Sequence, residues 1–142
     1  MSDLLDKIIV RFKTSDAQTR LELLLDYANR LSPLPDRYHA ARDQGLNRVL
    51  ECQSPVFLYM ERQNGGLELH ADAPREAPTV RGFVSLLQRS VRGASADGVR
   101  HIPGDLLDRL GLTEALGMTR MQGLTAIVAR VKQMAADLAG AA

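Results

Sequence analysis

The sequence is poor in cysteine and histidine, the residues that most often hold metals and clusters. Its 142 residues include one cysteine, Cys52, and three histidines. One cysteine cannot form an intramolecular disulfide. It also cannot by itself hold zinc or an iron–sulfur cluster, because these need several protein ligands. The thiol of Cys52 is therefore either a buried bystander or a nucleophile.

The chain also lacks an excess of charge and a long apolar run. Its 18 Lys and Arg residues balance 17 Asp and Glu, which leaves a formal net charge of +1 and no bulk attraction for nucleic acid or an anionic membrane. No stretch approaches the roughly 18 apolar residues of a membrane span. Asp3 and Asp6 stand where a signal peptide would be basic. We expect no nucleic-acid partner, no membrane association and, with one unpaired cysteine, a cytoplasmic location.

The histidines do not form a recognisable site. His39, His70 and His101 have no second ligand-type residue at the spacing of a zinc site, so surface positions are expected for them. A Cys–His hydrolase would need Cys52 to meet one of them in space, which the sequence does not establish. The scattered glycines form no phosphate-binding loop, and no bound cofactor or metal is expected.

Apolar periodicity predicts helices at both ends of the chain. Helical spacing marks the segments 3–12, 16–31, 78–92, 106–112 and 119–140. Ser2 and Ser95 are candidate N-caps. Ser15 with Gln18, and Thr119 with Gln122, match the capping-box pattern.

Between residues 46 and 72 the apolar period changes to two, which is typical of strands. Asn64-Gly65 predicts a hairpin turn between strands at 56–61 and 67–72, and a preceding strand at 46–50 would be a third partner. We therefore expect a single α+β domain, residues 1–142, with a small three-stranded antiparallel sheet flanked by N-terminal and C-terminal helices. Cys52 would lie in the connection between the first two strands.

Three charged residues bear on a possible site. Arg48 would favour the Cys52 thiolate if the chain brings it near, whereas the adjacent Glu51 would disfavour it. Arg120 is placed in the first turn of the last helix, where a cation opposes the macrodipole at a cost of about 0.3–1 kcal/mol. This placement fits a tertiary or partner contact, and it also fits an arginine that points to water.

Three ordered segments then share a pattern. They are Val49-Leu50-Glu51-Cys52-Gln53-Ser54-Pro55-Val56-Phe57, Val80-Arg81-Gly82-Phe83, and Leu112 followed by Leu116, Arg120, Gly123 and Leu124. Together they resemble the SufE-like family of sulfur-acceptor proteins over most of the chain. Two positions depart from the family pattern. Glu51 stands where the family usually has glycine, so the loop is less free to adopt positive φ, and Phe57 stands where it has tryptophan.

The resemblance implies a sulfur relay. The fold would be like that of SufE and of the IscU-type iron–sulfur scaffolds, although such scaffolds use several cysteines. Cys52 would take persulfide sulfur from a cysteine desulfurase, SufS-like or CsdA-like, stimulate that enzyme, and relay the sulfur to iron–sulfur cluster assembly on a scaffold. The desulfurase would carry pyridoxal phosphate, and this chain would carry no cofactor.

In this reading Cys52 is the catalytic residue, while Glu51, Gln53, Ser54 and Arg120 bind the partner or order the loop. The alternative is a non-catalytic protein-binding module in which Cys52 packs inertly. The oligomeric state, with a homodimer among the options, stays open.

Overall fold

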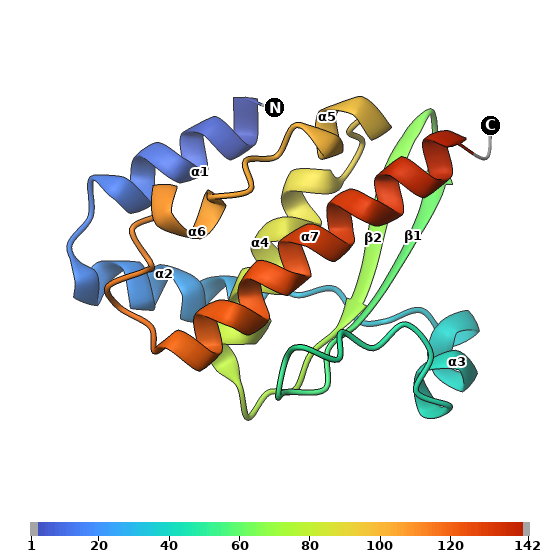
Figure 1. Cartoon of the computed structure of the whole chain (residues 1–142), viewed down its shortest axis with the longest axis horizontal. Helices are drawn as coiled ribbons and strands as arrows, with labels where there is room; N and C mark the ends of the chain where they lie inside the picture. The colour runs from blue at the N-terminus through green and yellow to red at the C-terminus, as the bar shows by residue number, and fades with distance from the viewer. Residues whose placement is uncertain (1–2, 141–142) are drawn as a thin grey trace.

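The computed structural model describes residues 3–140, and the candidate cap Ser2 lies outside them. Two helices open the chain, two strands follow an irregular segment, and further helices complete it (Figure 1). The elements are α1 Asp3–Lys13, α2 Ala17–Ala28, η1 Asp36–Tyr38, α3 His39–Asp43, β1 Phe57–Gln63, β2 Gly66–Asp72, α4 Pro78–Val91, α5 Ala96–Arg100, α6 Leu106–Arg109 and α7 Met118–Gly140. This order confirms the α+β class.

The hairpin β1–β2 has the predicted turn. Its strands are antiparallel, with Tyr59 opposite His70. Asn64 and Gly65 take positive φ values of 52° and 81°, the conformation that a tight Asn-Gly turn requires.

The predicted strand at 46–50 is wrong. In the part of the chain that the structure describes, the sheet has two strands, and this segment contributes one isolated bridge between Arg48 and Phe57. Asn47 has a φ of 63°, a left-handed conformation that interrupts an extended strand. The chain turns again from Leu50, so the pairing stays limited to this bridge and the hydrogen bonds beside it.

The two faces of the hairpin are buried by different elements. The face toward the main core carries Leu58, Leu67, Leu69 and Ala71. On the other face, Phe57 and Tyr59 form a small cluster with Leu34, against which Tyr38 packs. The rings of Tyr38 and Tyr59 stack with their centroids 4.5 Å apart. The irregular segment with η1 and α3 therefore covers the face of the sheet that points away from the long helices.

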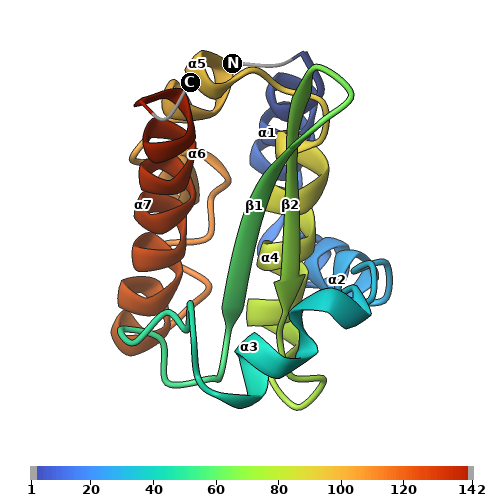
Figure 2. The ribbon, with the colours of Figure 1, turned by 90° about the vertical axis from the view of Figure 1, so that its right-hand side faces the viewer.

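The core face of the hairpin packs against the long helices. Helix α4 packs against β2 and α2, while α7 packs against β1 and α5. Figure 2 shows α7 to one side of the two strands and α2 to the other, with α1 and α4 behind the hairpin. In Figure 2 the segment between α3 and β1 lies beside the beginning of α7 at the lower end of the molecule, and α5 lies at the upper end. None of the helices within residues 3–140 is both long and apolar enough to cross a bilayer.

Helix α2 is capped one residue later than predicted. Oδ1 of Asp16 accepts a 2.8 Å hydrogen bond from the backbone N–H of Thr19, so Asp16 is the N-cap and the capping box of Ser15 and Gln18 is wrong. The Ser15 hydroxyl donates instead to the carbonyl of Arg11, over 2.6 Å. Both residues suit an N-cap, and the carboxylate of Asp16 also complements the positive end of the helix.

The beginning of α7 also differs from the prediction. The carbonyl of Gly117 accepts a 2.9 Å hydrogen bond from the backbone N–H of Met121, so Gly117 holds the N-cap position. Thr119 is already inside α7, and the capping box of Thr119 and Gln122 is therefore wrong. Since α7 begins at Met118, Arg120 lies in its first turn, as expected from the sequence.

Candidate active site around Cys52

Cys52 lies in a surface turn but points inward. Its backbone N–H donates a 3.2 Å hydrogen bond to the carbonyl of Val49, which closes the turn. Leu50, Glu51 and Gln53 on either side are exposed, and Leu50 is 82% exposed. Cys52 itself is only 4% exposed and joins the main core. The thiol is thus carried by an exposed turn and held against the interior.

The surface that receives the thiol is provided by helix α7. Gly123 is buried in this helix and faces Cys52. A Cβ atom added to Gly123 would lie 3.2 Å from Sγ and 3.3 Å from Cα of Cys52. Because glycine has no side chain, the turn packs directly against the backbone of α7 at this position.

A pocket of about 370 Å³ opens beside the thiol. The turn contributes Cys52, Gln53 and Ser54 to its lining, the first turns of α7 contribute Thr119, Arg120 and Gly123, and α4 contributes Val80. The structure thus brings Arg120 beside Cys52, Gln53 and Ser54, which the sequence had singled out in a distant part of the chain.

Burial and charge have opposite effects on the thiol. Burial raises the pKa of Cys52 above its ordinary value, because the thiolate is less well solvated there. A hydrogen bond from the Ser54 backbone and the positive charge of Arg48 both lower this pKa, with a smaller effect. The resting thiol is therefore mainly protonated, and exposing it to water would favour the reactive thiolate.

Arg120 is an exposed cation at the pocket. Its side chain forms no hydrogen bond or ion pair with any residue in the range 3–140. A cation near the positive end of α7 is electrostatically unfavourable. No hydrogen bond or ion pair within residues 3–140 compensates for this position of Arg120. This leaves the guanidinium available to a negatively charged group that enters the pocket or docks beside it.

Glu51 is placed differently from the other site candidates. It is exposed and does not line the pocket. The non-glycine residues with positive φ within residues 3–140 are Asn47 and Asn64, so Glu51 meets no steric strain at a position where the family usually has glycine. Glu51 therefore lies on the outer surface of the turn.

The sequence did not reveal the role of Gly123 or the structural contacts of Arg48. An isolated glycine inside a predicted helix is a signal of close packing, but it does not identify the neighbour. The carbonyl of Arg48 accepts a hydrogen bond of 3.4 Å from Arg130 of α7, a pairing across 82 residues of sequence. Such contacts depend on how the turn docks on the helix.

The histidines lie outside the pocket that contains Cys52. His70 pairs with Glu61 over 2.9 Å on the strands, and His39 contacts the carbonyl of Leu34. Within residues 3–140 no three His, Cys, Asp or Glu side chains are grouped to hold a metal ion.

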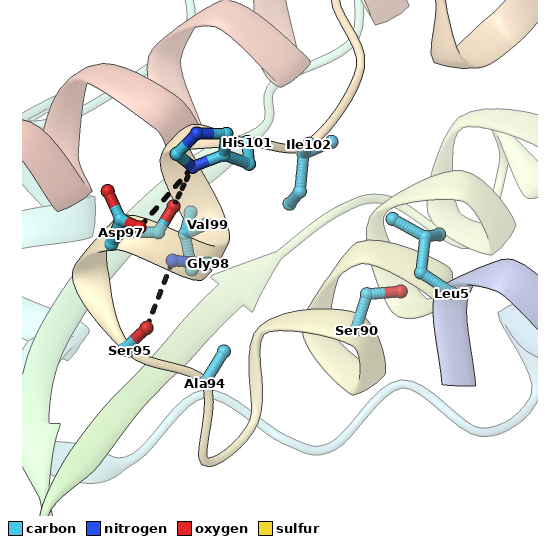
Figure 3. A pocket seen from close by; sticks show the side chains of 9 residues that line it. All are labelled: Leu5, Ser90, Ala94, Ser95, Asp97, Gly98, Val99, His101 and Ile102. Atoms are coloured by element: carbon cyan, nitrogen blue, oxygen red, sulfur yellow. Dashed lines mark hydrogen bonds and ion pairs between the residues drawn. The ribbon is translucent and has the colours of Figure 1, made fainter. Parts of the chain in front are cut away.

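His101 lines a different pocket, of about 500 Å³, near α5 (Figure 3). Its Nδ1 lies 2.7 Å from the carbonyl oxygen of Asp97. In the same view Ser95 accepts a 3.0 Å hydrogen bond from the Gly98 N–H, which confirms Ser95 as the N-cap of α5. These interactions hold the short helix α5 together. His101, like His39 and His70, therefore lies away from the pocket beside Cys52.

The fold and the site define a small α+β protein whose candidate reactive group is one loop thiol. The family model described as "SufE: Fe-S metabolism associated domain" matches residues 6–135, and the chain belongs to this family. The match includes the cysteine turn and most of α7. It supports a role in iron–sulfur metabolism.

Curated relatives and a solved structure agree with this assignment. An uncharacterised SufE-like protein of Mycobacterium tuberculosis H37Rv is 36% identical over 130 residues, covering 91% of this chain and 89% of the relative. The sulfur acceptor protein CsdE of Escherichia coli K12 is 32% identical over 117 residues, covering 78% of this chain and 76% of CsdE. The solution structure of a hypothetical protein from Thermus thermophilus has a TM-score of 0.81 at 30% identity and covers 94% of each chain.

Proposed function

We propose that the chain accepts sulfur on Cys52 from a cysteine desulfurase and relays it to iron–sulfur cluster assembly. The observation that carries this proposal is the placement of the only cysteine in an exposed turn, next to a pocket that Arg120 also lines. Similarity to CsdE, which is named a sulfur acceptor, supports the same role. The cytoplasm is the proposed location.

The proposed transfer is a thiol exchange. The thiolate of Cys52 attacks the outer sulfur of a persulfide on the desulfurase. The sulfur–sulfur bond of that persulfide breaks, and the desulfurase cysteine leaves as a thiolate. The outer sulfur and its proton end on Cys52 as a new persulfide. The step is balanced without an added oxidant or reductant, and one cysteine is sufficient for it.

The environment of Cys52 suits a group that reacts only when a partner is present. In the resting state the thiol is buried and mainly protonated, which limits its reaction with oxidants and small electrophiles. The residues around it in the turn are exposed, so a docking protein can contact them first. In this scheme the pyridoxal phosphate belongs to the desulfurase, SufS-like or CsdA-like, and the chain stimulates that enzyme by removing its sulfur.

The proposal is tested by incubating the protein with a desulfurase and free cysteine and measuring its intact mass. We expect a gain of about 32 Da that a thiol reductant reverses and that Cys52→Ser lacks. Ser95→Ala, far from the turn, serves as the control and should gain the same mass. Stimulation of the desulfurase by Cys52→Ser that equals stimulation by the parent would contradict the relay.

A second function is favoured by one observation, the 4% exposure of Cys52. A buried thiol with a raised pKa also fits a non-catalytic module that binds a desulfurase or another protein. In that case Cys52→Ala would bind the desulfurase as tightly as the parent does. The parent would also gain no sulfur, and its thiol would react slowly with labels even when the desulfurase is bound.

A further inference from the structure

The position of Gly123 is unusual for a glycine. It is the sixth residue of α7, a helix of 23 residues. Apart from proline, glycine is the residue least suited to a helix interior. Gly123 is also buried, so it does not serve a flexible surface turn. A specific neighbour must therefore account for it, and that neighbour is Cys52, whose atoms lie 3.2–3.5 Å from the position of a Cβ atom.

A second buried helical glycine makes a useful comparison. A Cβ atom on Gly82 of α4 would overlap the backbone carbonyl of Leu24, so Gly82 permits two helices to pack closely. Gly123, in contrast, faces a turn. The backbone of α2 is held by its own hydrogen-bond ladder and cannot retreat, whereas an exposed turn can move outward.

The turn that carries Cys52 is anchored at its base and has few hydrogen bonds at its tip. At its base, the Val49 N–H donates a 2.9 Å hydrogen bond to the carbonyl of Val56, and Arg130 of α7 donates to the carbonyl of Arg48. Within the turn itself, one backbone hydrogen bond of 3.2 Å joins Cys52 to Val49, and one side-chain hydrogen bond of 3.5 Å joins Arg48 to the carbonyl of Gln53. Leu50 has little packing to lose, since it is 82% exposed. A contact that is too close by a few tenths of an ångström can therefore be relieved by an outward shift of the turn.

We propose that Gly123 is the positioning residue that sets the resting place of Cys52, because its missing side chain lets the thiol seat against α7. A larger residue at this position pushes the turn outward, away from α7. The biological role of this contact rests on the proposed function, because the resting place of Cys52 sets how readily its thiol is presented to a desulfurase. The contact itself does not depend on that function.

The test is the rate at which Cys52 reacts with a small thiol reagent in the native protein. We expect Gly123→Ala to react several-fold faster than the parent. The midpoint of its rate against pH should move down toward the ordinary value for cysteine, because the burial that raises the pKa is reduced. Gly140→Ala is the matched control. It makes the same change in the same helix, at a position with nothing within 4 Å, and should react like the parent. An unchanged rate and pH profile in Gly123→Ala would overturn the proposal.

A double substitution keeps the test decisive if Gly123→Ala is poorly folded. Cys52→Ala removes Sγ, the atom nearest to the added methyl group. We therefore expect Gly123→Ala to lower the melting temperature less in the Cys52→Ala background than in the parent. An equal loss in both backgrounds would overturn the proposal.

These assays separate the two ideas, because neither uses a desulfurase. Faster labelling of Gly123→Ala without any sulfur uptake by the parent would refute the relay alone. Sulfur uptake by the parent with unchanged labelling of Gly123→Ala would refute the role of Gly123 alone.

Discussion

The guanidinium of Arg48 donates a 3.5 Å hydrogen bond to the carbonyl oxygen of Gln53, across the turn that carries Cys52. The Nε atom of Arg48 is buried and has no hydrogen-bond partner among the described residues. Its charge lowers the pKa of the Cys52 thiol against the larger, opposite effect of burial. Arg48 therefore has two separable effects, on the closure of the turn and on the charge state of the thiol.

Two substitutions of Arg48 separate these effects. Arg48→Gln keeps a hydrogen-bond donor but removes the charge, so the thiol pKa should rise and the labelling rate at neutral pH should fall several-fold. Arg48→Lys keeps the charge, and its midpoint should stay close to that of the parent. The measurement is the rate of thiol labelling between about pH 6 and 10. A midpoint in Arg48→Gln that matches the parent would show that the charge has no effect on the thiol.

Arg120 is expected to affect binding and stability in opposite directions. It is exposed beside the pocket and opposes the dipole of α7, so Arg120→Ala should leave the free energy of unfolding unchanged or raise it by about 0.3–1 kcal/mol. Its loss should weaken desulfurase binding by roughly threefold to tenfold, as for one charge at the rim of an interface. Binding and sulfur uptake are measured beside chemical unfolding. Arg100→Ala, an exposed arginine of α5, is the control. Parent-like binding and uptake in Arg120→Ala would remove this residue from the site.

Much of the fold could be predicted from the sequence because it depends on local periodicity. The alternation around Leu58 and Leu69 correctly placed the hairpin, and Asn64-Gly65 correctly placed its turn. The predicted third strand failed because one left-handed residue, Asn47, ends the extended conformation, and apolar periodicity does not report φ.

The candidate site could be predicted only in part. The cysteine segment and Arg120 were recognised separately, yet their common pocket depends on how the turn docks against α7, which is a contact between residues distant in sequence. Gly123 was recognised only as part of a family pattern. Its physical role requires the position of the Cys52 sulfur, and no local signal in the sequence provides that position.

Glu51 is expected to restrict the backbone of the turn that carries Cys52. Glu51→Gly allows more backbone conformations in the turn, so the thiol should be exposed more often and react several-fold faster. Glu51→Gln removes the charge but keeps the side chain, which separates repulsion from flexibility. Glu114→Gly, in another exposed turn, is the control. A labelling rate in Glu51→Gly no higher than in the parent would show that this residue does not restrain the turn.

Glu61 forms a charged cluster on the outer face of the sheet. Its carboxylate accepts a 2.6 Å hydrogen bond from the hydroxyl of Tyr38 and is also bound by His70 and Arg37. These interactions, with Tyr38 first, lower the pKa of Glu61 from 4.5 to about 2. Since the pKa is lower in the folded protein, the stabilisation is fully present above pH 4.5 and is lost as the pH falls toward 2.

Tyr38→Phe removes the largest of these effects while keeping the ring that stacks on Tyr59. We expect the free energy of unfolding at pH 7 to fall by about 1–2 kcal/mol, because a hydrogen bond to a partly exposed charged group is lost. The difference from the parent should shrink as the pH is lowered from 4.5 toward 2, since a protonated Glu61 no longer gains from the hydroxyl. Urea unfolding at a series of pH values measures both effects. Tyr27→Phe is the control, because the Tyr27 hydroxyl has no hydrogen-bond partner within residues 3–140 and its loss should be nearly neutral. A stability difference for Tyr38→Phe that stays constant down to about pH 2 would show that Glu61 does not titrate through this hydrogen bond.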